Sequence, residues 1–113
     1  MKQHLTRYSE PDELLRVKKS LQFIYEVVKS YEERLYDHVG FSCAIAISKA
    51  EELKDQVSKF CPAHSSLKDL IEALRQLDGG ESARAEAKRR LEVISVYFGL
   101  EKYTLVSRIK DGA

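Results

Sequence analysis

The sequence predicts an all-α protein, a four-helix up-down bundle with a long first helix, from three observations. Apolar residues recur at intervals of three and four in four separate segments, and this spacing places side chains on one face of an α-helix. Only five glycines and two prolines occur in 113 residues, and most of them lie at the predicted ends of these segments. The composition is 43% hydrophobic and 33% charged, a balance typical of a globular helical domain.

The first segment is predicted as a helix from Glu10 to His38. Ser9 is expected as its N-cap, with Pro11 in the first turn and Asp12 completing a capping box. At 1.5 Å per residue the helix would measure about 40 Å, more than any other helix of the chain. Its apolar stripe consists of Leu14, Val17, Leu21, Ile24, Val28, Tyr31 and Leu35.

The second helix is predicted from Ser42 to Phe60. It follows a break at Gly40, and Pro62 is interpreted as its stop. Small alanines in its first half are expected to let a neighbouring helix approach closely, so this segment is placed at the centre of the fold.

A shorter third helix is predicted with Ser65 or Ser66 as its cap and with Asp78-Gly79-Gly80 as its stop. Its stripe consists of Leu67, Leu70, Ile71, Leu74 and Leu77. The spacing of this stripe makes it an amphipathic helix that covers part of the core.

The fourth helix is predicted from Ser82 to Phe98, with Gly99 as a left-handed terminator and Leu100 as its hydrophobic partner. Residues 93–98 are mostly β-branched or aromatic and residues 103–109 alternate in polarity, so a hairpin about Gly99 is an alternative for residues 93–109. The alanine-rich, charge-interleaved start of the segment favours a helix.

These helices predict one hydrophobic core. Its expected members are Leu14, Val17, Leu21, Ile24, Val28, Leu35, Ile45, Ile47, Leu53, Val57, Phe60, Leu67, Leu70, Ile71, Leu74, Leu91, Ile94 and Phe98. We expect a single domain spanning residues 1–113, with tails at residues 1–8 and 110–113.

The charge balance argues against binding driven by overall charge. Nineteen basic and eighteen acidic residues leave a net charge of +1, so nucleic acid is an unlikely partner and no membrane interaction is expected. The sequence contains no window resembling a membrane span or a signal peptide, and we expect a cytoplasmic protein. Cys43 and Cys61 would lie about 27 Å apart along one helix, too far for a disulfide, which is consistent with a reducing compartment.

Acidic residues on the first two helices suggest one enzymatic alternative, a metal-dependent nucleotide phosphohydrolase. The candidate metal ligands are Glu32, Glu33, Glu52 and Asp55. Their arrangement distantly resembles the EExxE and ExxD pattern of MazG-type pyrophosphohydrolases, in which carboxylates one turn apart hold metal ions. Tyr36 occupies the position of the third acid, so no membership is assigned, and solvated surface carboxylates are the simpler interpretation.

Other kinds of site find less support. Arg84, Lys88, Arg89 and Arg90 form one basic cluster, which suggests a nucleic-acid-binding regulator as a second alternative, but Glu81, Glu86 and Glu92 are interleaved with it. The three histidines do not have metal-ligand spacing, and the glycines do not form a phosphate loop. We therefore predict no catalytic residue, metal ligand or cofactor.

Aromatic residues flank the stripe of the first helix and widen its apolar surface. The candidate interface residues are Phe23, Tyr25, Val27, Tyr31 and Tyr36. Large aromatic side chains are enriched at protein interfaces, although two neighbours within one bundle would account for them as well. We predict a non-enzymatic helical interaction module, a small regulator or adaptor that forms a homodimer through its first helix or binds another protein.

Overall fold

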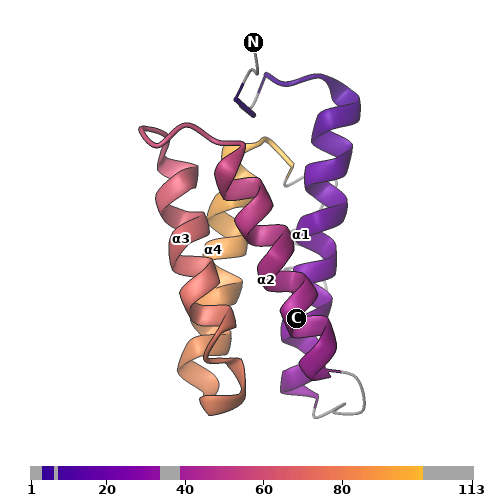
Figure 1. The fold of residues 1–113 in the computed structure, drawn as a ribbon, viewed down its shortest axis with the longest axis vertical. Helices are drawn as coiled ribbons and strands as arrows, with labels where there is room; N and C mark the ends of the chain where they lie inside the picture. The colour runs from indigo at the N-terminus through magenta and orange to yellow at the C-terminus, as the bar shows by residue number, and fades with distance from the viewer. Residues whose placement is uncertain (1–3, 7, 34–38, 101–113) are drawn as a thin grey trace.

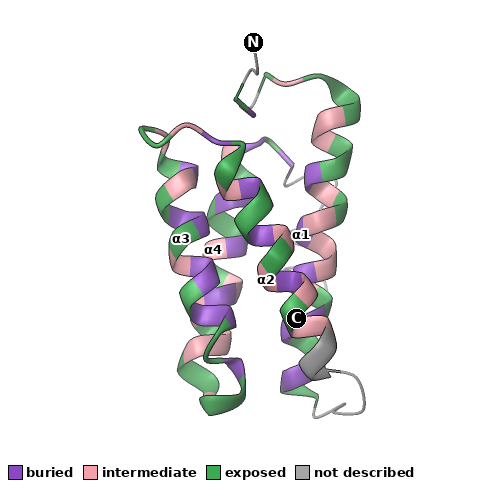
Figure 2. Cartoon of the chain, in the orientation of Figure 1, coloured by how far each residue is buried: buried purple, intermediate pink, exposed green. Residues whose placement is uncertain are grey.

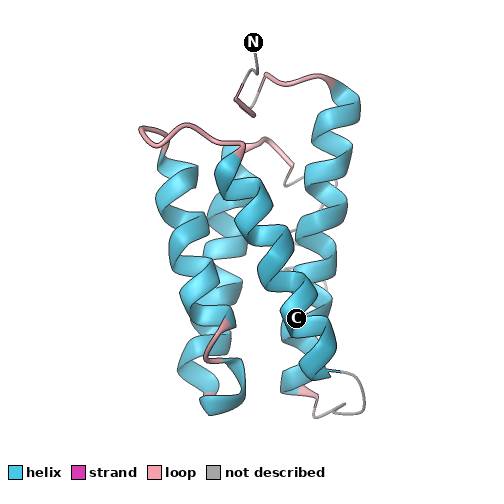
Figure 3. Cartoon of the chain, in the orientation of Figure 1, coloured by secondary structure: helices cyan, strands magenta, loops and turns pink. Residues whose placement is uncertain are grey.

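The computed structural model describes residues 4–6, 8–33 and 39–100 (Figure 1). These residues form α1 (Pro11–Glu32), α2 (Val39–Asp55), α3 (Pro62–Leu74), the short 3-10 helix η2 (Leu77–Gly79) and α4 (Glu81–Tyr97). Successive α-helices run in opposite directions, and the described part of the chain contains no strand (Figure 3). The predicted all-α, four-helix up-down bundle is confirmed.

Each helix packs on two others around a common core. α1 contacts α2 and α4, and α3 contacts the same two helices on the other side of the bundle. Figure 2 shows buried residues along the sides of the helices that face one another. This arrangement is expected of helices with one apolar stripe, because four such stripes can be removed from water together.

The start of α1 differs by one residue from the prediction. Glu10, not Ser9, is the N-cap, and its N–H donates to the carboxylate of Glu13 at 3.2 Å. The Ser9 hydroxyl instead accepts from the N–H of Thr6 at 2.8 Å, which closes the preceding turn. The helix ends at Glu32 after 22 residues, about 33 Å, with Glu33 as its C-cap, so the prediction of one helix to His38 is wrong at this end; residues 34–38 lie outside the described residues.

Both predicted ends of α2 are wrong. The predicted break at Gly40 lies inside the helix, which already begins at Val39. One glycine inside a helix costs only about 1 kcal/mol relative to alanine, and the packing of α2 on α1 and α3 offsets this cost. At the other end the helix stops at Asp55, and Phe60, predicted in the core, is 97% exposed in the following turn.

The predicted cap of α3 at Ser65 or Ser66 is wrong, because the observed N-cap is Cys61. Pro62 occupies the first turn, where its missing N–H requires no partner, and the Cys61 thiol accepts from the N–H of Ala63 at 3.4 Å. The Cys61-Pro62 pair therefore starts a helix, although the sequence analysis interpreted it only as a stop.

The end of α4 confirms the predicted glycine terminator. Gly99 adopts a left-handed conformation with φ 69°. Its N–H bonds the carbonyl of Val96 at 3.0 Å, and the N–H of Leu100 bonds the carbonyl of Ser95 at 2.9 Å, the two bonds of a Schellman motif. Because residues 93–97 are helical, the hairpin alternative is wrong for them; residues 103–109 lie outside the described part.

The core contains most of the residues that periodicity predicted. Eleven of its largest side chains are almost completely buried: Phe98, Leu21, Ile24, Leu67, Leu70, Leu74, Leu77, Leu91, Ile94, Val17 and Val28. Leu14 and Ile47 are only partly buried against this core, Ile45 is half-buried and outside it, and Leu35 lies outside the described residues. No helix of the described chain combines the length and apolar character needed to cross a membrane.

The N-terminal residues that were expected as a tail include one core residue. Leu5 is 7% exposed, and its N–H donates to the carbonyl of Gln56 at 2.7 Å, just after the end of α2. This contact fastens the segment before α1 across the adjacent end of the bundle (Figure 1).

Candidate functional site

Two neighbours in the same chain account for the broad apolar surface of α1. Phe23 lies on the side toward α2, where the Lys49 ammonium is 5.4 Å from the centre of its ring. The opposite side faces α4, where Glu32 pairs with Lys88 at 2.6 Å. Tyr25 lies seven residues, about two turns, before Glu32 and therefore on that same side. α1 thus packs against α2 on one side and against α4 on the other.

Four of the five candidate interface residues lie in the core or pack against it. Val27 and Tyr31 are 4% and 8% exposed and belong to the core. Phe23 and Tyr25 are partly buried against it, and Tyr36 lies outside the described residues. For the four described residues, contacts inside one chain explain the apolar character without a second molecule.

The four carboxylates considered for a metal site lie at opposite ends of the bundle. Glu32 and Glu33 end α1, whereas Glu52 and Asp55 end α2, and these two helices run in opposite directions (Figure 1). Glu52 shares a pocket with Arg16, and the sixteen residues from Arg16 to Glu32 span about 24 Å along α1. No group of three or more His, Cys, Asp or Glu among the described residues could hold a metal ion.

The basic cluster of α4 mainly holds the bundle together. The Arg84 Nε donates to the carbonyl of Leu77 at 3.1 Å, and Lys88 makes the ion pair with α1 given above. The guanidinium of Arg90 lies 3.5 Å from the carboxylate of Asp69 on α3. These three side chains link α4 to its neighbours, so they are already engaged within the bundle and are poor candidates for binding the phosphates of a nucleic acid.

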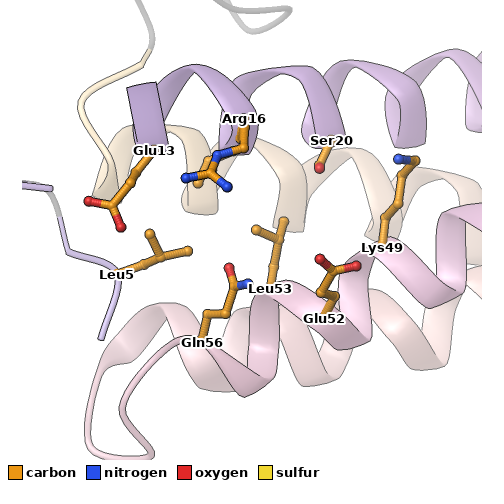
Figure 4. Close-up of a pocket in the computed structure, with 9 residues that line it drawn as sticks. Leu5, Glu13, Arg16, Ser20, Lys49, Glu52, Leu53 and Gln56 are labelled. Atoms are coloured by element: carbon orange, nitrogen blue, oxygen red, sulfur yellow. The ribbon is translucent and has the colours of Figure 1, made fainter. Parts of the chain in front are cut away.

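A pocket of about 280 Å³ lies between α1 and α2, near the start of α1 (Figure 4). Its charged side chains come from both helices, two acidic and two basic: Glu13, Arg16, Lys49 and Glu52. Their formal charges cancel, so the pocket has no net attraction for an anion or a cation. Its volume is also below the range of about 300–1,000 Å³ typical of small-molecule sites.

At the opposite end of the bundle, a phenol and a thiol lie between α1, α2 and α3. The thiol of Cys43 donates to the carbonyl of Leu74 at 3.3 Å. Burial raises the pKa of Tyr31 to about 12, and the neighbouring Cys43 adds to this rise. Burial also raises the pKa of the Cys43 thiol. Because the thiolate is the reactive form, this cysteine is suited to packing rather than to nucleophilic chemistry.

The outer face of α4 carries a row of exposed residues at helical spacing. We call Ala85, Arg89, Glu92 and Val96 the outer stripe; they recur at intervals of four, three and four and are all exposed. Val96 is 51% exposed, and Val93 beside the stripe is 40% exposed. This face was not predicted, because the β-branched residues of the segment were interpreted as evidence for a strand. Valines on the outward side of a helix were the signal that could have identified it.

The apolar residues of α1 other than Leu15 are buried or half-buried, whereas α4 exposes two valines, Val93 and Val96. Comparisons of the chain with protein-family models, with curated proteins and with solved structures find no match.

Proposed function

We propose that this protein is a non-enzymatic helical interaction module that binds a protein partner through the outer stripe of α4. The observation that carries the proposal is the exposure of Val93 and Val96, which are 40% and 51% exposed and lie one turn apart. Apolar side chains that remain in water on one helix face are typical of surfaces that associate.

The helix-propensity cost of these valines, which the fold of a single chain does not offset by burial, supports the proposal. A β-branched residue in a helix is less favourable than alanine by about 0.5 kcal/mol, because its side chain loses rotamer freedom against the preceding turn. Core residues offset this cost by burial, as Ile94 does at 0% exposure. Val96 gains little from the fold, so contact with a partner would supply the missing compensation.

The proposed surface differs from the one expected on the first helix. The outward positions of α1 are mostly charged, including Lys19, Glu26 and Lys29, and Leu15 is the apolar exception at 47% exposure. α4 is the better candidate because two of its valines, Val93 and Val96, are exposed one turn apart, whereas α1 exposes a single leucine. We place this interaction in the cytoplasm, a setting supported by the free thiols of Cys43 and Cys61.

Site-specific photo-crosslinking tests the proposal. A benzophenone amino acid at position 96 of the full chain, expressed in its native cell, is expected to form a discrete covalent adduct with a protein. The matched control carries the same amino acid at position 19, an exposed site on the outward face of α1. Absence of an adduct at position 96, or equal adducts at both positions, would contradict the proposal.

A further inference from the structure

We propose that the partner of the outer stripe is a second copy of this chain, paired antiparallel about a two-fold axis that passes between Arg89 and Glu92. This inference rests on the proposed function and adds the identity and orientation of the partner. It is carried by the order of residues along the stripe: read in reverse, the two central positions carry the opposite charges and the two end positions are again apolar.

The spacing of the stripe suits a helix pair. Intervals of four, three and four residues, from Ala85 through Arg89 and Glu92 to Val96, keep all four side chains on one line along the helix. Two such lines can lie side by side over about three turns. The same spacing of three and four residues supports the contact seam of coiled coils.

Antiparallel pairing about the centre of the stripe brings complementary groups together. A residue n then faces residue 181 − n of the partner copy, by the helix register alone. Arg89 of each copy faces Glu92 of the other, which gives two symmetric ion pairs at the centre. Val96 faces Ala85, so a large apolar side chain meets a small one at each end. Parallel pairing would instead place Arg89 of one copy against Arg89 of the other, and these like charges would repel.

The charged residues of the stripe are available for this pairing. The Arg89 side chain is 68% exposed, and its one ion pair within the described residues is a contact of 3.5 Å to Glu86. That carboxylate is also bound at 2.6 Å by Arg90. Glu92 is exposed and forms no ion pair among the residues that the structure describes. Both central groups can therefore turn to a second copy without breaking a strong contact.

A single pair of helix faces buries little surface, so we expect a weak dimer. Interfaces below about 1,200 Å² are typical of transient complexes. Sedimentation equilibrium of the purified full chain, from about 10 μM to about 1 mM, covers the dissociation constants that such an interface would have.

Charge reversal tests the pairing. Arg89→Glu gives a stripe with two acidic residues, and Glu92→Arg gives one with two basic residues, so each variant should repel itself. We expect each to raise the dimer dissociation constant by at least about ten-fold. An equal mixture of the two variants should associate again, because each residue of one copy then faces an opposite charge on the other. The double variant Arg89→Glu/Glu92→Arg should behave like the original chain.

Lys19→Glu is the matched control, because it changes the net charge as much as Arg89→Glu does but lies on the outward face of α1. It should leave the dissociation constant within about two-fold, since a distant exposed charge is largely screened. Circular dichroism of every variant checks that the bundle is intact.

The outcomes separate this inference from the proposed function. A monomeric mass up to about 1 mM, or dimerisation that the reversals leave unchanged, overturns the self-pairing. If the position-96 crosslink then joins the chain to a different protein, the interaction module stands and only the identity of its partner is wrong. If position 96 forms no crosslink either, both proposals fail.

Discussion

At the scale of single residues, Tyr31 shows how position in the bundle changes an ordinary side chain. Its phenol lies at the end of α1, is 8% exposed and has a pKa raised to about 12, first because burial disfavours the charged form. The sequence analysis placed this residue both on the apolar stripe and among the candidate interface residues. The burial of Tyr31 within its own chain agrees with its assignment to the apolar stripe.

This pKa shift predicts how stability depends on pH. The neutral phenol is favoured by the fold, so its contribution is complete below the unfolded pKa of 10 and is lost as the pH rises toward 12. We expect the free energy of unfolding of the original chain to fall more steeply between pH 10 and 12 than that of Tyr31→Phe, which has no proton to lose. Denaturant titrations at several pH values measure both slopes. Parallel slopes would show that Tyr31 ionises as easily in the folded chain as in the unfolded one.

At the scale of elements, local signals predicted some helix ends correctly and others not. Gly99 followed by Leu100 marks the end of α4 because only a residue without a Cβ adopts a left-handed conformation readily. Cys61-Pro62 was misinterpreted because proline disfavours a helix before it and favours one after it. Which effect matters depends on where the chain turns, and here the turn precedes Pro62.

The end of α4 offers a direct test of the glycine terminator. No heavy atom lies within 4 Å of the position where a Cβ would stand on Gly99, so Gly99→Ala meets no steric clash, and its cost is the strain of φ 69° alone. We expect the free energy of unfolding to fall by about 1 kcal/mol. Gly79→Ala is the matched control, because it also meets no atom within 4 Å and no positive φ occurs there. Equal effects of the two substitutions would contradict the assignment of strain to Gly99.

At the scale of the whole molecule, the segment before α1 closes one end of the bundle. Leu5 lies far from the core residues of α2 in the sequence, yet it packs in the same cluster and bonds the carbonyl of Gln56. Because the sequence around Leu5 has no helical periodicity, residues 1–8 were expected as a tail.

Leu5→Ala tests whether this segment contributes to stability. We expect the free energy of unfolding to fall by about 2 kcal/mol, the lower end of the range for buried leucines, since the site is at an end of the bundle. Leu15→Ala is the matched control, because Leu15 is 47% exposed and its truncation removes little buried surface. Chemical denaturation measures both variants. Similar small losses would mean that the N-terminal segment is attached without stabilising the fold.

The all-α class, the four helices and most of the core follow from the sequence, because hydrophobic periodicity is a local property that each amphipathic helix must satisfy. The stripe through Leu21 and Ile24 and the one through Leu67 and Leu70 are buried as predicted. Which face of each helix is covered by a neighbouring helix depended on the tertiary structure. α2 and α4 pack on α1, and Phe23, Tyr25 and Tyr31 lie in the core or against it, while the opposite directions of α1 and α2 separate Glu32 from Glu52. The exposure of Val96 was equally undetermined, because the same valine suits a buried helix face, a strand or a docking surface until its neighbours are placed.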